Sequence, residues 1–179
     1  MTRRHRLAHW LVLAGIALGS AGCVGSWQAA AHPLAAHKTY TNAKFGYAVN
    51  YPTNWKRSTL SGIQFAAFAP DHNAFITANA VPGTLTVAQI KTAQKGALTN
   101  LGTLQGTISY GPRSIHGVTF QLAEALVKNK AGSLLDAVLI DTVRHGSLYV
   151  FNAGVVQKLS LTNKETTAVL NSLNSITIQ

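Results

Sequence analysis

The sequence comprises 179 residues with a formal net charge of +10, and 47% of its side chains are hydrophobic. This hydrophobic content excludes an intrinsically disordered chain, and the length is sufficient for one domain with its own core. The single cysteine excludes a disulfide framework within the chain, and the scattered basic residues form no clustered stripe of the kind typical of nucleic-acid-binding proteins.

Residues 1–22 have the three parts of a secretory signal peptide. Three arginines stand within the first six residues, residues 7–18 form a short apolar stretch, and small residues lead up to Cys23. A membrane-spanning helix needs about 20 apolar residues, so this stretch has the length of a signal rather than of a span. The alternative is an uncleaved membrane anchor over residues 7–25.

The end of this segment, Ala21-Gly22-Cys23, resembles the lipobox of bacterial lipoproteins, although Ser20 stands where that family more often has Leu. The resemblance implies cleavage before Cys23 and attachment of a diacylglyceryl group, with acyl chains such as palmitate, to its sulfur. The protein would then be lipid-anchored on the outer, extracytoplasmic face of the cell membrane.

Residues 23–39 are rich in Ala, include Gly25 and Pro33 and show no periodic apolar face, so they predict a flexible tether. His32 and His37 lie in this segment, but no further ligand lies near them to complete a metal site. Beyond the signal peptide the basic residues still outnumber the five acidic ones. This excess either serves a solvated surface or attracts anionic headgroups and wall polymers.

The folded domain is predicted to cover residues 40–179. Its first strand is predicted at residues 45–51, where aromatic and Val side chains alternate with small or polar ones. Pro52 ends that strand because proline cannot donate to a sheet ladder, and Trp55 returns to the core after a turn.

A hairpin is predicted next, with strands at residues 63–69 and 74–81 around a turn-rich tetrad. Thr86 and Gln89 form a capping box that begins a helix. Gly102 is expected to end this helix by adopting the left-handed conformation.

Four further strands are predicted, and the short turns between the last three make those strands antiparallel. They cover residues 104–110, 117–127, 133–143 and 147–157. Thr162 and Glu165 form a second capping box, and Val169, Leu170 and Leu173 mark the buried face of the last helix. The predicted fold class is α+β, with an antiparallel sheet of about six to eight strands packed with two main helices.

Several of these features resemble the PsbP-like and Mog1-like domains. Those domains open with an aromatic-Gly-aromatic strand followed by Tyr-Pro-x-x-Trp. The matching positions are Phe45, Gly46, Tyr47, Tyr51, Pro52 and Trp55. Further similarities are the hairpin at residues 146–149 and the closing segment at 170–178. The resemblance implies a PsbP/Mog1-like α/β/α sandwich over most of residues 40–179, and its motifs support the fold rather than an activity.

The usual catalytic motifs are missing from the sequence, which has no Gly-x-Ser-x-Gly elbow and no phosphate-binding glycine loop. One carboxylate pair remains. If the hairpin after the second long strand turns symmetrically about Lys130, Glu124 lies opposite Asp136, and two facing carboxylates repel unless they share a proton or a cation. A register shift of one residue, or a bulge, would separate them.

The other candidate ligands are weaker. His72, His116 and His145 are predicted in exposed turns or at strand starts, and a zinc site needs three or four convergent ligands. Asp141 and Arg144 are interpreted as a surface ion pair that contributes little to stability.

The sequence thus predicts a lipid-anchored, extracytoplasmic binding or assembly domain without catalytic residues, cofactor or metal. Its expected partners are the membrane, through Cys23, and a protein or an envelope polymer, with no nucleic acid, and it is expected to be a monomer. The alternative is a small extracytoplasmic metal-binding protein or enzyme that uses Glu124 and Asp136 with a nearby histidine.

Overall fold

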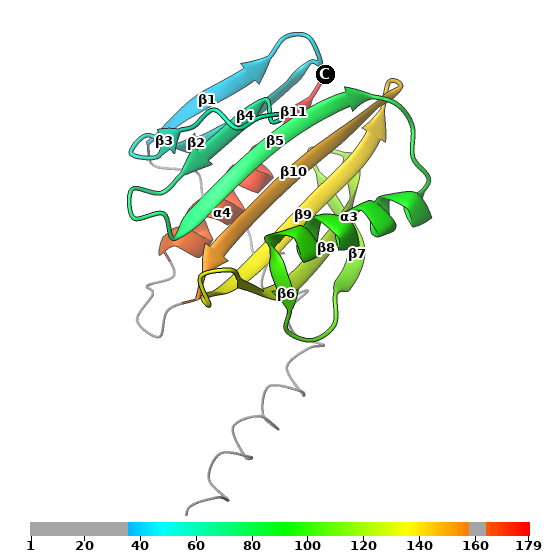
Figure 1. The fold of residues 1–179 in the computed structure, drawn as a ribbon. Coiled ribbons are helices and arrows are strands. Elements are labelled where there is room, and N and C mark those ends of the chain that lie inside the picture. The colour runs from blue at the N-terminus through cyan, green and yellow to red at the C-terminus, as the bar shows by residue number, and fades with distance from the viewer. Residues whose placement is uncertain (1–35, 158–163) are drawn as a thin grey trace, which may run out of the picture.

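The computed structural model describes residues 36–157 and 164–179, which form two helices and eleven strands (Figure 1). The elements up to the first helix are β1 (His37–Asn42), β2 (Tyr47–Pro52), β3 (Lys56–Arg57), β4 (Phe65–Phe68), β5 (Ala74–Pro82) and α3 (Val87–Leu101). The later elements are β6 (Gly102–Leu104), β7 (Ser109–Ile115), β8 (Val118–Asn129), β9 (Leu134–Arg144), β10 (Ser147–Val156), α4 (Lys164–Asn174) and β11 (Thr177–Ile178).

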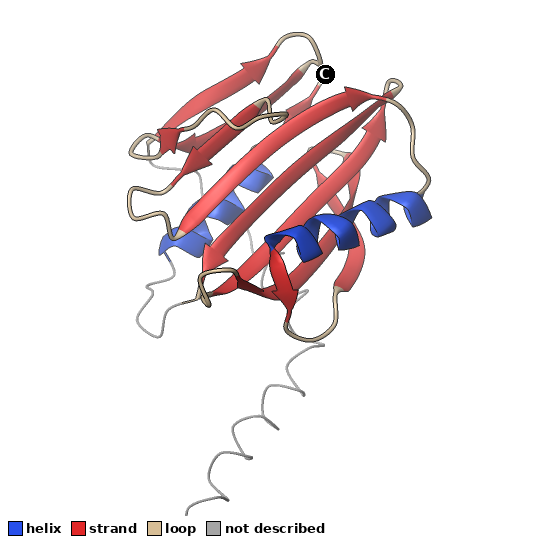
Figure 2. Ribbon diagram, in the orientation of Figure 1, coloured by secondary structure: helices blue, strands red, loops and turns tan. Residues whose placement is uncertain are grey.

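The strands form two antiparallel sheets. The large sheet has eight strands in the order β3-β4-β5-β10-β9-β8-β6, with β7 also paired to β8, and the small sheet has the order β1-β2-β11. Helix α3 lies on one side of the large sheet, and α4 lies on the other (Figure 2). These findings confirm the predicted α+β class with an antiparallel sheet and two helices.

The two sides of the large sheet are named here after their helices. The α3 face carries Ala137, Leu139 and Asp141 of β9, and α3 packs on it over β8 and β9. The α4 face carries the alternate side chains, such as Val138 and Ile140, and α4 packs on it against β5 and β10 while also contacting β2. This division follows from the pleat, which sends successive side chains to opposite faces.

Aromatic rings fill the core on the α4 face. Tyr47, Phe120 and Phe151 are at most 1% exposed, and their rings meet edge to face, with centroids 5.6 Å apart for Tyr47 and Phe151 and 6.1 Å for Phe120 and Phe151. Such pairs contribute about 0.5–1.5 kcal/mol each beyond the area they bury. The predicted inner face of the last helix is confirmed, because its three apolar side chains are buried in this cluster. They are Val169, Leu170 and Leu173.

Helix α3 begins as predicted but ends differently. The Thr86 hydroxyl accepts a hydrogen bond from the Gln89 backbone N–H, and the Gln89 side chain accepts one from the Thr86 N–H, which completes the capping box. Gly102 is not in the left-handed helical conformation, since its φ is 158° and its ψ is −153°. A Cβ at Gly102 would lie 2.2 Å from the carbonyl oxygen of Lys128. Glycine is therefore needed here for the close approach of β6 to β8.

The prediction of one strand at residues 104–110 is wrong, because the chain forms two separate strands, β6 and β7, in this region. β6 pairs with the last three residues of β8, and β7 pairs with its first seven. At twelve residues, β8 is long enough for both strands to pair along one edge. The segment between them stays attached through the N–H of Gln105, which donates to the Leu126 carbonyl at 2.8 Å.

The folded region begins earlier than the predicted boundary at residue 40. Strand β1 starts at His37, and all six of its residues pair with β2. Residues 37–39, which the sequence assigns to the tether, therefore belong to the small sheet. Within the part of the chain that the structure describes, no helix is long and apolar enough to cross a membrane.

Candidate functional site

The register of the β8–β9 hairpin separates the predicted carboxylate pair. Glu124 lies opposite Val138, and Asp136 lies opposite Leu126, so the two carboxylates are diagonal neighbours on the α4 face. The prediction that they face each other directly is wrong. Diagonal neighbours in a sheet stand about 7–8 Å apart at their backbones, which is too far for a shared hydrogen bond between short side chains.

Asn129 accounts for this register. Its side-chain oxygen accepts hydrogen bonds from the N–H groups of Ala131 and Ser133, at 3.0 and 2.9 Å. These bonds centre the turn on Ala131 rather than on Lys130. Because a hairpin folds back on its own centre, a displacement of one residue in the turn moves every cross-strand partner by two residues.

Glu124 is buried, with 4% of its surface exposed, and neither of its carboxylate oxygens has a hydrogen-bond partner within residues 36–157 and 164–179. Burial raises its pKa to about 7, the charge of Arg113 on β7 opposes that rise, and the charge of Asp136 adds to it. Arg113 also donates a hydrogen bond to the side-chain oxygen of Asn174 at the end of α4. This cluster connects β7 and β8 to the last helix.

Asp136 has a partner of its own. Its two oxygens accept hydrogen bonds from the Gln157 amide at 3.0 and 2.8 Å. Burial raises the pKa of Asp136, and the hydrogen bond from Gln157 lowers it. No group of three or more His, Cys, Asp or Glu side chains within residues 36–157 and 164–179 is placed to hold a metal ion. The geometry therefore does not support a metal site at Glu124 and Asp136 with a histidine.

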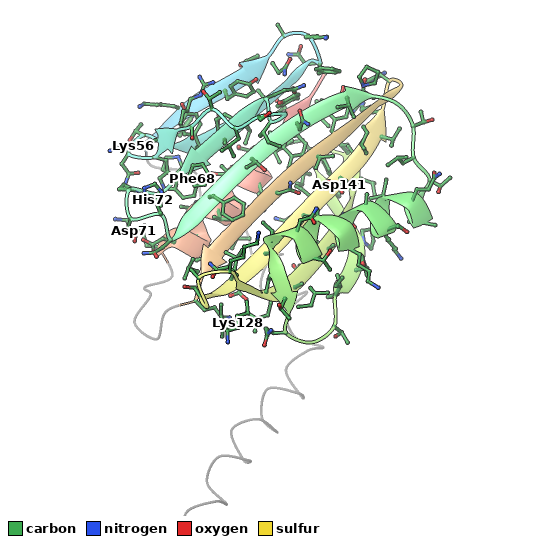
Figure 3. All side chains as sticks on the ribbon, viewed as in Figure 1. Lys56, Phe68, Asp71, His72, Lys128 and Asp141 are labelled. Atoms are coloured by element: carbon green, nitrogen blue, oxygen red, sulfur yellow. The ribbon has the colours of Figure 1, made fainter. Side chains whose placement is uncertain are left out.

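The three histidines that were predicted in turns are exposed. His72, His116 and His145 all have positive φ angles, between 48° and 58°. His116 and His145 each precede a glycine that also has positive φ, as type I′ hairpin turns require. His72 lies at the tip of the β4–β5 hairpin, far from Asp141, which lies beside α3 (Figure 3). Their positions are explained by the turns.

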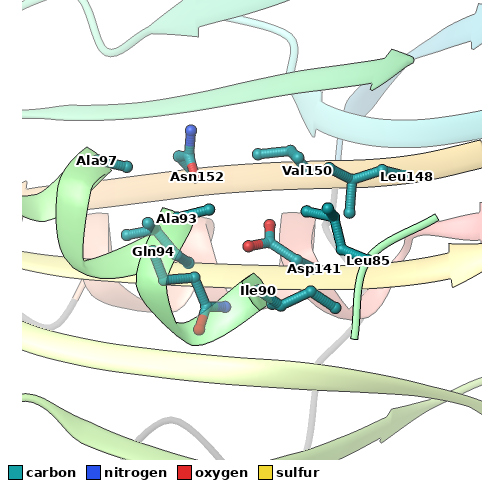
Figure 4. A pocket seen from close by; sticks show the side chains of 10 residues that line it. Leu85, Ile90, Ala93, Gln94, Ala97, Asp141, Leu148, Val150 and Asn152 are labelled. Atoms are coloured by element: carbon teal, nitrogen blue, oxygen red, sulfur yellow. The ribbon is translucent and has the colours of Figure 1, made fainter. Parts of the chain in front are cut away.

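A pocket that the sequence did not predict lies between α3 and the α3 face of the sheet. It has a volume of about 170 Å³ and is lined by residues of α3, β9 and β10 and of the segment before α3 (Figure 4). Three polar side chains reach it, Gln94 of α3, Asp141 of β9 and Asn152 of β10, and the remaining lining is apolar. This is our candidate functional site.

Asp141 is the charged group of this pocket. It is 3% exposed, and one of its oxygens, Oδ1, has no hydrogen-bond partner in the part of the chain that the structure describes. Burial raises its pKa to about 7, although hydrogen bonding to the Gln94 side chain and to the Phe151 backbone opposes the rise. The interpretation of Asp141 and Arg144 as a surface pair is wrong, because Asp141 is buried and Arg144 donates instead to the His145 ring at 3.0 Å.

Gln94 is held in place by the sheet. It is 1% exposed, and its amide nitrogen donates to the backbone carbonyl of Gln121 on β8 at 2.9 Å. This bond holds α3 against β8 and orients the Gln94 amide. Its oxygen is left buried and without a partner.

A sequence signal for this site did exist. Strand β9 is apolar on both faces between Ala137 and Ile140, a pattern typical of a strand covered on both sides. An acidic residue that continues such a run, as Asp141 does, is expected inside the protein rather than on its surface. The short separation of Asp141 and Arg144 in the sequence suggests a surface pair, whereas the apolar run that precedes Asp141 is the signal of its burial.

The residues of the predicted fold motif lie in the core or at its edge. Tyr47 is 1% exposed, Tyr51 and Trp55 are each 5% exposed, Pro52 is buried, and Phe45 is half-buried in the turn before β2. Gly46 has a φ of 63°, a conformation that glycine adopts without strain.

The predicted lipidation site, Cys23, and the capping residue Thr162 lie outside the described residues.

Solved structures with the same fold are known. The chain resembles cyanobacterial PsbP (CyanoP) from Synechocystis sp. PCC 6803 with a TM-score of 0.60 and 14% identity, over 82% of this chain and 94% of that one. The Ran-binding protein Mog1p of Saccharomyces cerevisiae matches with a TM-score of 0.56 and 10% identity, over 79% of this chain and 95% of that one. LpqN of Mycobacterium tuberculosis, which is involved in cell envelope biogenesis, matches with a TM-score of 0.52 and 16% identity, over 80% of this chain and 90% of that one. No protein-family model and no curated protein matches the chain. The chain therefore has a PsbP/Mog1-like fold.

Proposed function

We propose that this protein is a non-catalytic binding domain that is lipid-anchored through Cys23 on the outer face of a cell membrane. The observation that carries the binding role is the composition of the pocket under α3. Among the described residues, Asp141 is the single titratable one in its lining, and that lining includes no Ser, Thr, Cys, His or Lys. A nucleophilic mechanism combines a nucleophile with a base and an orienting group, whereas this pocket offers shape and one charge.

The fold gives independent support for a binding role. Similar folds occur in a Ran-binding protein and in a protein involved in cell envelope biogenesis. A protein or an envelope polymer is accordingly the partner we propose for the domain. The support for the anchor comes from the sequence, where a basic start, a short apolar stretch and Ala21-Gly22-Cys23 follow one another.

Mass spectrometry of the full chain expressed in a bacterial host tests the anchor. The membrane fraction is expected to contain a chain that begins at Cys23 and carries a diacylglyceryl group on its sulfur. Two or three acyl chains hold a protein at a membrane far more firmly than a single myristoyl chain does. Cys23→Ser should leave a precursor of higher mass, without acyl chains and with a folded domain.

Ser20→Leu is the matched control for this experiment, because it alters the same segment and moves it toward the common lipobox. It should keep both cleavage and acylation. An unmodified Cys23 thiol, or an N-terminus well downstream of residue 23, would contradict lipid anchoring. Crosslinking of the anchored chain in its membrane, followed by recovery, tests the binding role, and repeated failure to recover a protein or an envelope polymer would contradict that role.

A further inference from the structure

The pocket under α3 has the size and lining of a site for a small, mostly apolar molecule. Its volume of about 170 Å³ is close to that of a cavity of about 150 Å³ that accommodates benzene. Most of its lining is aliphatic, including Leu85, Ile90, Ala93, Leu139, Leu148 and Val150. Ala93 is exposed, so the pocket reaches the surface beside α3.

Three side-chain oxygens of the pocket accept no hydrogen bond from the described residues. They are buried oxygens without a hydrogen-bond partner among the described residues, namely Gln94 Oε1, Asp141 Oδ1 and Asn152 Oδ1. Turning the Gln94 amide over would not correct this, because its nitrogen already donates to the Gln121 carbonyl. Buried acceptors in folded proteins are nearly always paired, so three of them around one pocket indicate a missing donor.

Two of these acceptors stand on neighbouring strands and on the same face of the sheet. Asp141 lies opposite Val150 in the β9–β10 pair, and Asn152 is two residues further along β10, on the same face. The Asp141 carboxylate points into the space between α3 and β10 (Figure 4). A group seated there would meet one charged and one neutral acceptor.

We propose that this pocket binds a small primary amine in its ammonium form, with the cation at Asp141 and Asn152 and a hydrocarbon group of benzene size against the aliphatic lining. An ammonium group has three donors and no acceptor, which matches the three unpaired oxygens of this pocket. Its hydrogen bond to a carboxylate is charge-assisted and is stronger than a neutral one. An anionic ligand would be repelled by Asp141, and a pure hydrocarbon would leave its oxygens unpaired. This assignment rests on the binding role proposed above and names the class of small ligand that the domain would bind. It does not depend on the lipid anchor.

Calorimetric titration of the full chain at pH 8 tests this assignment. The probes are benzylamine, its neutral isostere benzyl alcohol, and benzoate. We expect benzylamine to bind with a Kd at least ten-fold lower than that of benzyl alcohol, and benzoate not to bind. Equal Kd values for benzylamine and benzyl alcohol, or no heat from benzylamine with a protein that circular dichroism shows to be folded, would overturn the proposal.

Variants then locate the site. Asp141→Asn should raise the Kd of benzylamine at least ten-fold, and it should change the Kd of benzyl alcohol by less than two-fold. Glu124→Gln is the matched control, because it removes a second buried carboxylate on the opposite face and should change neither affinity. Ala93→Leu should raise the Kd of both ligands about five-fold, because the larger side chain narrows the mouth of the pocket. If Asp141→Asn and Glu124→Gln affect benzylamine equally, the cation is not bound in this pocket, and that result overturns the assignment even when the ligand preference holds.

Discussion

The two faces of the large sheet are packed in different ways. On the α4 face, large aromatic side chains interlock with one another and with the inner side of α4. On the α3 face, the buried cluster contains small side chains such as Ala123 and Ala137, and a pocket remains between helix and sheet. Dense packing maximises stability, whereas a pocket lined by unpaired acceptors costs stability in the absence of a ligand. We infer that the α4 face holds the domain together and that the α3 face is available for binding.

The largest effect is expected in the aromatic core. Trp55→Ala should destabilise the domain by about 3–5 kcal/mol, since the ring is 5% exposed and its removal leaves a large cavity in the cluster that packs with α4. The free energy of unfolding is measured by urea titration. Val87→Ala, at a position that is 49% exposed, is the control and should change stability by less than about 0.5 kcal/mol. Unchanged stability of Trp55→Ala combined with lost partner binding would instead assign Trp55 to a surface site.

The next effect concerns the buried carboxylates, one on each face. Burial raises the pKa of both Asp141 and Glu124 to about 7, from the usual values of 3.8 for Asp and 4.5 for Glu. The folded state therefore holds protons that the unfolded state has already released, and stability is lost as the pH rises through about 7. Between pH 5 and pH 8 the wild type should lose about 2–3 kcal/mol for each carboxylate.

Urea titrations across this pH range separate the two groups. Asp141→Asn should abolish the part of the stability loss that comes from Asp141, and Glu124→Gln should abolish the part that comes from Glu124. The unfolding free energy of each variant should therefore change less with pH than that of the wild type. Both variants should also be more stable than the wild type at pH 8. A profile for Asp141→Asn that runs parallel to that of the wild type would show that Asp141 is already ionised at pH 5.

A smaller effect is expected at the two glycines that flank the second half of α3. Gly102→Ala should destabilise the domain by about 1–3 kcal/mol, because the new Cβ would meet the backbone of Lys128 on β8. Gly96→Ala lies in the same helix with no atom within 4 Å of the added Cβ, and it should stabilise the domain by about 0.5–1 kcal/mol. Thermal unfolding of both variants measures the difference. Equal effects of the two changes would mean that β6 can move away from β8 at little cost.

Some local features could be read directly from the sequence. The capping box at Thr86 and Gln89 depends on neighbouring residues alone, and the structure contains it. The His145-Gly146 turn is equally local, because two residues with positive φ and a tight hairpin specify one another. The boundaries of β6 and β7 were missed because both strands owe their existence to one edge of β8, which lies far from β6 in the chain.

The candidate site was harder to predict than the fold. The sequence pointed to Glu124 and Asp136, and a displacement of one residue in the turn, imposed by Asn129, separated them. It also placed Asp141 on the surface, although the covering helix buries it against β10. In both cases the identity of the residue was plain, and its environment depended on a partner strand or helix.

The sequence by itself determined the alternation that makes the strands, the caps and turns that separate them, and the short connections that make the sheet antiparallel. These features are local, because they depend on the φ and ψ preferences and hydrogen bonds of residues close in the chain. The tertiary structure alone decided the register of β8 on β9, the need for glycine at Gly102 and the burial of Asp141. The physical reason is that each of these depends on how closely two distant segments approach, and that distance is set by the packing of α3 and the neighbouring strands on one shared sheet.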